Sequence, residues 1–437
     1  MVNIAFAGEF PAFGHVLQSY IKVSPNILNK RKILNDPVHG FITLPGDLFY
    51  DILEHRYFQR LRRIKQLGLT HLVYPGALHT RFHHALGAMH LMLQAIQVLR
   101  NKGHDISPEE AEGAALAILL HDIGHGPFSH ALEHSIVQGM DHEDLSDLFI
   151  RRMNQESGGK LEIAMAIFRG HYHKRFLHKM VASQLDMDRL DYLKRDSFFT
   201  GVSEGVINSD RIINMLEMAE DELVAEAKGI YSIEKFIIAR RLMYWQVYLH
   251  RTVLGAEQLL IHILRRAQML SAAGEPLFAT PALMRFLSCT CHATDFQEKP
   301  DLLDTFARLD DFDIFTSIKV WQDHPDPLLS VLSRRMVNRQ LFRTEIAGQP
   351  ADEESLHHLR RKAEQRFGLD AGLGGMMVFT GEIANNAYNP EEDRIWLLYR
   401  DGKLVDIAEA SDQINISVLS HKVTKYFLSF PKELDLS

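Results

Sequence analysis

Histidine and aspartate residues crowd into one short stretch of the chain, which reads HDIGHGPFSH from His121 to His130. Imidazoles and carboxylates together are ligands that transition metals favour in proteins. On a continuous helix the adjacent side chains of His121 and Asp122 would diverge by about 100°, but Gly124 and the residues after it break the helix. His125 and His130 follow in the same stretch. The spacing therefore predicts that these side chains converge on one site.

Two residues elsewhere in the chain complete a set of metal ligands. His84 lies at the start of a predicted helix, and Asp188 lies on another. Together with His121 and Asp122 they supply two imidazoles and two carboxylates, a set that suits Fe, Mn, Zn or Ni better than Ca or Mg. The alternative is that these residues are polar groups satisfied within helix packing. The combination of all four favours a metal site.

Five segments of the chain resemble, in the same order, segments of one protein family: KILNDPVHG, FQRLRRIKQLG, YPGALHTRFHHALG, LLHDIGHGPFSH and LDMDRLDYLKRDS. With the ligand pattern His84, His121–Asp122 and Asp188, they are similar to the HD superfamily of metal-dependent phosphohydrolases. The sequence is more similar still to the branch that hydrolyses deoxynucleoside triphosphates, which includes the animal SAM-and-HD-domain protein and bacterial relatives. The resemblance is strong over residues 32–255 and looser elsewhere.

The resemblance implies a role for individual positions of this chain. It implies that the metal ligands are His84, His121, Asp122 and Asp188. It implies that His125, His130 and His142 act at the reacting phosphate, with Glu133, an Asp in the family, supporting His130. It implies that the substrate contacts are Arg81, Gln66, Leu67, Arg189 (a Lys in the animal protein), Tyr192 and Asp196, the last facing the 3′-hydroxyl. The cofactor is then a divalent transition metal (Fe, Mn, Zn or Ni), with Mg on the substrate phosphates.

Elementary chemistry agrees with these roles. A divalent metal activates water for attack on phosphorus, while Arg81, Arg189 and His125 would stabilise the charge of the phosphate. The leaving alkoxide needs a proton, and His130 is the candidate acid. Glu133 follows about one helical turn later, where it could orient the imidazole of His130.

For several residues the sequence leaves a structural alternative open. His130 and His142 could be structural histidines, and Arg189 and Arg195 could lie on a solvated or ion-paired helix face. A solvated or ion-paired position for either arginine is about as compatible with the spacing as a contact to phosphate.

Three further features have simpler explanations than a functional site. Tyr192 could be a core aromatic, although its spacing from Asp188 turns it towards the metal face. Cys289 and Cys291 lack a second ligand pair at usable spacing, so two free thiols are expected rather than a zinc site. The arginines within residues 334–343 are first read as a solvated helix face, with an interface or an anion site as the alternatives.

The sequence therefore predicts an enzyme that hydrolyses deoxynucleoside triphosphates to deoxynucleoside and triphosphate. The alternatives are an HD phosphohydrolase that acts on another nucleotide, such as a monophosphate, and a non-catalytic nucleotide-sensing HD protein. The resemblance also implies a regulatory nucleotide site at Lys32, Asn35, Gln59 and Arg62, where Glu54 replaces an Asp. We accordingly expect a nucleotide substrate, a nucleotide effector and a homo-oligomer, either dimer or tetramer, without a membrane or a dedicated nucleic-acid partner.

The elements that must position these residues are predicted to be mainly helical. Periodicity and capping signals predict helices over 48–67, 83–100, 108–120, 180–200 and 236–267, and a helix from residue 142 that ends before a polar loop at 151–160. A β-hairpin is predicted over 32–45, and strands over 376–380, 395–399 and 404–407. We expect a mainly α fold, with an HD-domain helical core and a smaller α+β C-terminal appendage. The expected divisions are an N-terminal segment of unclear role (1–30), the catalytic core (31–270) and a C-terminal helical and α+β region (271–437).

Composition narrows the class of protein. The chain has 437 residues, of which 46% are hydrophobic and 24% charged, as in ordinary globular proteins. A formal net charge of −8 argues against a dedicated nucleic-acid binder. Only two cysteines are present, and the chain shows neither a basic, apolar leader nor an apolar run of the ~20 residues that cross a bilayer. A reducing, cytoplasmic location is therefore expected.

Overall fold

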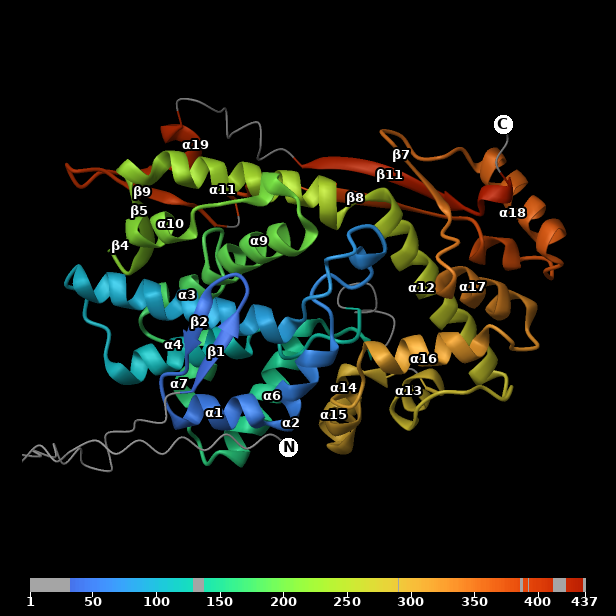
Figure 1. Ribbon diagram of the computed structural model, residues 1–437, viewed down its shortest axis with the longest axis horizontal. Coiled ribbons are helices and arrows are strands. Elements are labelled where there is room, and N and C mark those ends of the chain that lie inside the picture. The colour runs from blue at the N-terminus through green and yellow to red at the C-terminus, as the bar shows by residue number, and fades with distance from the viewer. Residues whose placement is uncertain are drawn as a thin grey trace, which may run out of the picture.

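The structure is a computed structural model that describes residues 32–128, 137–289, 291–385, 388–391, 393–411 and 422–434. Helices account for most of the described chain, and short strands from several parts of it form small sheets (Figure 1). The prediction of a mainly α fold is confirmed. None of the helices in these residues is long and apolar enough to cross a membrane.

The first part of the described chain contains a hairpin and two of the helices that carry candidate ligands. Its elements are β1 (Ile33–Asp36), β2 (Gly40–Thr43), α1 (Asp47–Glu54), α2 (Arg56–Gln59), η2 (Arg60–Arg63), η3 (Thr70–Leu72), α3 (Arg81–Asn101) and α4 (Pro108–Leu120). The strands β1 and β2 pair antiparallel, as predicted. The helix α4 begins with a capping box in which Ser107 and Glu110 satisfy each other's backbone N–H groups, and Pro108 occupies its first turn.

The central part of the chain supplies the remaining helices around the site. Its elements are β3 (Val137–Gln138), α6 (His142–Glu156), α7 (Glu162–Phe168), α8 (Arg175–Val181), α9 (Met187–Thr200), η5 (Ser203–Gly205), α10 (Ser209–Met215), β4 (Leu216–Ala219), β5 (Glu222–Glu226), η6 (Ala227–Gly229), α11 (Ile230–Met243), η7 (Tyr244–Tyr248) and α12 (Arg251–Ala272). The carboxylate of Asp186 caps α9 by accepting a hydrogen bond from the Arg189 N–H. The same helix ends at Gly201, whose φ of 74° lies in the left-handed region that favours glycine.

The C-terminal part mixes short helices with strands. Its elements are α13 (Pro281–Leu287), β6 (Cys291–His292), α14 (Ala293–Glu298), α15 (Asp301–Phe306), α16 (Asp311–Trp321), α17 (Pro327–Val337), β7 (Arg343–Ala347), α18 (Glu353–Phe367), η8 (Leu373–Met376), β8 (Phe379–Asn385), β9 (Trp396–Leu398), β10 (Leu404–Asp406), α19 (Ile407–Ala410), β11 (Val423–Phe430) and η9 (Lys432–Leu434). Strand β11 lies between β7 and β8 in one sheet, and a second sheet has the order β10-β9-β5-β4. Because β5 pairs with β9, the second sheet joins strands from both sides of residue 270.

The helix α3 lies near the centre of the helical body, where it packs against α4 and α9, and the β1–β2 hairpin lies across it (Figure 1). Met89, Leu91 and Met92 on this helix are fully buried. Burial of a side chain of this kind contributes roughly 1.5–3 kcal/mol relative to exposure. Close packing of three helices therefore holds the candidate ligands that they carry.

Two predicted helices are broken in the structure, and the helix predicted over 180–200 begins only at Met187, as α9. The segment predicted as one helix over 48–67 divides at His55, which has extended backbone and whose ring accepts a hydrogen bond from the Tyr57 N–H, so that α2 starts anew. The segment predicted as one helix over 236–267 is interrupted by the π-helical turn η7, and α12 starts anew after the extended residue His250. The amphipathic period continues through both breaks, so periodicity alone did not reveal them.

One predicted loop is helical in the structure. Residues 151–160 were expected to leave the helix, but α6 continues to Glu156 before glycines end it. Phe149, Ile150 and Met153 are buried on one side of α6, and this apolar face keeps the polar residues between them helical.

Candidate active site

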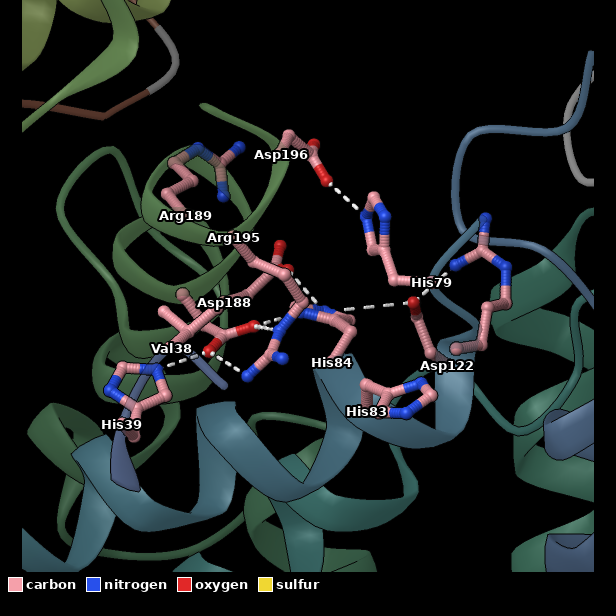
Figure 2. Close-up of polar contacts among 12 residues, drawn as sticks. Val38, His39, His79, His83, His84, Asp122, Asp188, Arg189, Arg195 and Asp196 are labelled. Atoms are coloured by element: carbon pink, nitrogen blue, oxygen red, sulfur yellow. Dashed lines mark hydrogen bonds and ion pairs between the residues drawn. The ribbon is translucent and has the colours of Figure 1, made fainter. Parts of the chain in front are cut away.

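Three helices bring the four predicted metal ligands to one point. His84 lies on α3, His121 and Asp122 follow α4, and Asp188 lies in the first turn of α9. The Nε2 atoms of His84 and His121 lie 3.0 and 3.4 Å from Oδ1 of Asp188. Nε2 of His121 is also 3.3 Å from Oδ1 of Asp122, and Nε2 of His84 is 3.8 Å from Oδ2 of Asp122. Figure 2 shows His84 reaching towards Asp122 on one side and Asp188 on the other.

The two imidazoles are oriented so that one nitrogen of each faces this point. Nδ1 of His84 lies 2.8 Å from Oδ2 of Asp191, and Nδ1 of His121 lies 2.6 Å from the carbonyl oxygen of Ile118. With the proton of each ring on Nδ1, Nε2 keeps its lone pair for a metal. Both Nε2 atoms are buried, and both face the carboxylate oxygens of Asp122 and Asp188. Two such nitrogens beside two carboxylates fit a divalent transition metal.

The carboxylates give this point a strongly negative environment. Burial would lower the pKa of His84, but its hydrogen bonds with Asp188 and Asp191 raise that pKa to about 10. Burial likewise opposes ionisation of Asp188, yet the neighbouring histidines hold its pKa well below the usual range. A field that favours protonated histidines also favours a bound cation.

A buried network of ion pairs supports His84. Asp191 accepts hydrogen bonds from Arg195 (Nε to Oδ2, 2.9 Å) and lies 2.6 Å from Nε2 of His39, in addition to its contact with His84. Arg195 also donates to Asp36, at 2.8 Å, in the β1–β2 turn. Burial would raise the pKa of Asp191, but the Arg195 charge and the histidine hydrogen bonds hold it well below its usual range. The network therefore keeps a full negative charge behind the ligand.

Space for this network depends on a glycine in α3. A Cβ atom at Gly87 would lie 2.0 Å from Oδ1 of Asp191 and 2.2 Å from Nη2 of Arg195. The missing side chain lets α9 approach α3 closely enough for Asp191 to reach His84.

A second group of polar residues adjoins the ligands. His125 Nδ1 lies 3.4 Å from Oδ1 of Asp122, and its ring centroid lies 3.9 Å from that of His142. Oxygen and nitrogen atoms of Asp122, His125 and His142 are close enough to hold a cation between them. Arg81 donates a hydrogen bond from Nη1 to Asp122. His130 and Glu133, the predicted acid and its support, lie outside the described residues.

These groups open into a cavity of about 430 Å³, a size typical of small-molecule sites. Its wall includes the predicted site residues Gln66, Leu67, Arg81, Asp122, His125, His142, Asp188, Arg189, Tyr192 and Asp196. The structure therefore gathers the predicted substrate contacts around one space beside the predicted metal ligands. The roles of these residues stay predictions.

The cavity wall already fixes two of the predicted substrate contacts. Oδ1 of Asp196 lies 2.7 Å from Nε2 of His79 (Figure 2). Oδ2 of Asp196 accepts a hydrogen bond from the Tyr248 hydroxyl at 2.8 Å. Arg189 pairs with Asp186 and still lines the cavity. Burial lowers the pKa of Arg189, but the Asp186 charge outweighs it and raises the pKa above its ordinary value. Arg189 therefore stays a cation facing the cavity.

The structure decides the structural alternatives that the sequence left open for Arg195 and for the two cysteines. Arg195 is fully buried in ion pairs with Asp36 and Asp191, so the structural alternative holds for it. Cys289 and Cys291 are free thiols, as expected.

Among the arginines of residues 334–343, Arg334, Arg339 and Arg343 are exposed and Arg335 is buried. Arg334 pairs with Asp323 and Arg335 with Glu433, while Arg339 donates to the carbonyl oxygen of Leu72. These contacts bind the C-terminal region together and to the loop before α3.

The residues of the predicted regulatory site lie on the hairpin and on α2 and η2. Gln59 donates to the carbonyl oxygen of Leu53 and accepts a hydrogen bond from Nε of Arg62 at 3.0 Å. Lys32 Nζ lies 3.0 Å from the ring centre of Tyr50. Asn35 pairs with Phe41 in the hairpin. Nucleotide binding by these residues stays a prediction.

Several residues of the site were not identified from the sequence. Tyr244, Tyr248, Leu249 and Glu257 reach the cavity because the helix predicted over 236–267 breaks between them. A continuous helix would spread these positions over different faces, so spacing gave no signal for them.

Residues 81–196 match the HD domain family, and residues 207–274 match the HD associated region. The fold superposes on the crystal structure of a phosphohydrolase from Bacteroides thetaiotaomicron with a TM-score of 0.89 and 54% identity, over 92% of this chain and 99% of that one. The chain belongs to the HD-domain phosphohydrolase superfamily. Within that superfamily it is 33% identical to the uncharacterized protein YwfO of Bacillus subtilis, over 93% of this chain and 94% of that protein.

Other relatives of this HD-domain phosphohydrolase carry a named activity. A Dictyostelium discoideum protein named deoxynucleoside triphosphate triphosphohydrolase SAMHD1 homolog is 31% identical over 50% of this chain. This chain spans only 46% of the length of that relative. The HD domain match begins at Arg81 and ends at Asp196, two residues of the cavity wall, so the conserved domain of the superfamily coincides with the site described above.

Proposed function

We propose that this HD-domain phosphohydrolase hydrolyses deoxynucleoside triphosphates to deoxynucleoside and triphosphate, with a divalent transition metal held by His84, His121, Asp122 and Asp188. The observation that carries the proposal is that one cavity joins the metal-ligand cluster, two arginines and the Asp196–Tyr248 pair. A triphosphate needs the cations, and a sugar hydroxyl needs the carboxylate and the phenol. The similarity to named deoxynucleoside triphosphate triphosphohydrolases over half of this chain supports the same substrate.

Different residues of the chain would bind the metal, stabilise the phosphate charge and transfer protons in this reaction. A divalent metal bound by these ligands supplies Lewis-acid activation of water. In the net reaction the water oxygen bonds to the α-phosphorus, the bond from that phosphorus to O5′ breaks, and O5′ gains a proton. Arg81 and Arg189 line the cavity where they stabilise the phosphate charge. His125 and His142 stand beside Asp122, where an imidazole can hold or transfer a proton.

The middle of the cavity is suited to the sugar. Asp196 is held by His79 and Tyr248, so that its carboxylate is fixed before a substrate binds. Rings of Tyr192 and Tyr248 lie 6.2 Å apart, edge to face, and supply an apolar wall beside the carboxylate. The 3′-hydroxyl of the substrate would hydrogen-bond to the Asp196 carboxylate, and the deoxyribose ring would lie against the flat rings of Tyr192 and Tyr248.

Product analysis tests the proposal. Purified protein is incubated with each of the common deoxynucleoside triphosphates and Mn²⁺ or Mg²⁺, with and without GTP, and the products are separated by ion-exchange chromatography. Triphosphate and deoxynucleoside in equal amounts are expected, and orthophosphate or no turnover would refute the proposed reaction. Stimulation by GTP would support the effector that we also propose for Lys32, Asn35, Gln59 and Arg62, together with a homo-oligomer. Release of orthophosphate from deoxynucleoside monophosphates would support the alternative substrate instead.

A further inference from the structure

A carboxylic acid of the cavity wall has no partner and no part in the chemistry above. Glu257 lies in the second turn of α12 and lines the same cavity as the candidate ligands. It is half-buried, and no hydrogen bond or ion pair joins it to any residue that the structure describes. A carboxyl group withdrawn from water without a partner is costly unless a ligand supplies the missing donor.

The electrostatics set Glu257 apart from the phosphate-binding end of the cavity. Burial alone raises the pKa of Glu257 to about 8. No charged group at the metal end contributes to that shift, whereas the neighbouring histidines lower the pKa values of Asp122 and Asp188 against the effect of burial. A carboxyl group close to a triphosphate would also meet like charge. Glu257 is therefore placed to meet an uncharged part of the ligand.

The neighbouring wall has the character of a nucleobase site. Leu67 and Leu249 supply apolar side chains to the cavity. Oε1 of Gln66 is buried and accepts no hydrogen bond from any described residue. With Glu257, the wall thus offers apolar surface and two acceptor groups that lack donors. A planar heterocycle with an amino group satisfies both requirements.

We propose that Glu257 selects the base of the substrate by accepting a hydrogen bond from an exocyclic amino group, so that cytosine and adenine are preferred over uracil and thymine. The inference rests on the proposed function for the identity of the ligand. Cytosine carries an amino donor where uracil carries a carbonyl acceptor, and the two rings are otherwise alike in size. The pair of dCTP and dUTP therefore isolates the hydrogen bond from shape.

The test compares the ratio of kcat/KM for dCTP to that for dUTP in three variants, at a pH above 8, where the Glu257 carboxyl is ionised and can only accept hydrogen bonds. Glu257→Leu removes the acceptor, and the ratio should fall about 10-fold from its wild-type value. Glu257→Gln offers an amide N–H donor as well as an acceptor oxygen, so it can pair with either base and should lose most of the preference. Gln258→Leu, at the next position of α12 and outside the cavity wall, should leave the ratio unchanged. An unchanged ratio in Glu257→Leu, or an equal loss with both substrates, would overturn the inference.

A binding measurement separates this inference from the proposed reaction. Calorimetry of deoxycytidine and deoxyuridine with wild-type protein and with Glu257→Gln needs no turnover and no variant with altered volume. Wild-type protein should bind deoxycytidine more tightly, whatever reaction it catalyses, and equal affinities would refute a role for Glu257 in base selection. Absence of turnover with every triphosphate, together with a preference for deoxycytidine, would refute the proposed reaction and leave the base site standing.

Discussion

The carboxylate of Asp191 should set the metal affinity of the site without touching the metal. It lies 2.8 Å from Nδ1 of His84, fixing the ring so that Nε2 faces the other ligands. Substitution of such a supporting carboxylate typically weakens metal binding 10- to 100-fold, or by about 1.4–2.7 kcal/mol. Asp191→Asn keeps the shape of the side chain but removes the charge behind the imidazole. We therefore expect a loss of that size in the dissociation constant for Zn²⁺ or Mn²⁺, measured by competition with a chromophoric chelator.

A matched variant separates metal affinity from folding. Asp36 binds the same buried guanidinium, that of Arg195, at 2.8 Å, but it does not contact His84. Removing either carboxylate leaves the guanidinium with one buried anion instead of two, and loss of a partner in such a pair costs about 3–5 kcal/mol. Asp36→Asn and Asp191→Asn should thus lower the melting temperature by comparable amounts, while only Asp191→Asn weakens metal binding. Equal metal affinity in the two variants would refute the supporting role of Asp191.

Three further outcomes are expected. Asp122→Ala should abolish both bound metal, measured by elemental analysis, and turnover; full activity in this variant would show that the ligand assignment is wrong. Gly87→Ala would place a methyl group against Asp191 and should destabilise the protein by about 1–3 kcal/mol in denaturant unfolding, whereas Gly348→Ala, with open space around it, should not, and equal stabilities would contradict the close packing. Burial raises the pKa of Glu257 from 4.5 to about 8 in the folded protein, so folding takes up a proton between these pH values; the stability of Glu257→Gln relative to wild type should therefore rise between about pH 4.5 and about pH 8 and level off above that, and a difference independent of pH would contradict the burial.

The metal end of the site could be predicted from the sequence because its residues lie in short, distinctive segments. His121 and Asp122 follow a helix whose start is marked by Ser107 and Pro108, and the structure places that start where the capping signals do. Helix-capping signals of this kind depend on few neighbouring residues, so they predict the start of a helix without knowledge of its tertiary contacts. His84 and Asp188 were joined to the pair because they complete a ligand set and match the resemblance, since the contact between α3 and α9 has no local signal.

The other wall of the cavity could not be predicted in the same way. Tyr244, Tyr248 and Glu257 share the cavity only because the chain passes through a π-helical turn and then restarts a helix after His250. The energy that favours the break lies partly in tertiary contacts, such as the hydrogen bond from the Tyr248 hydroxyl to Asp196. Apolar periodicity is the same on both sides of the break, so a single long helix was the natural interpretation.

The C-terminal region supports one wall of the site, although it contributes no predicted ligand. The helix α12 packs against β7, and a Cβ atom at Gly255 would lie only 2.3 Å from Oγ1 of Thr344 in that strand. Thr344 in turn lies 2.7 Å, hydroxyl to hydroxyl, from Ser429 of β11. Glu257 follows Gly255 by two residues, so the sheet fixes the depth at which its carboxyl group enters the cavity. Metal ligation thus depends on the packing of α3, α4 and α9, whereas the wall that meets the base depends on a sheet assembled from the end of the chain.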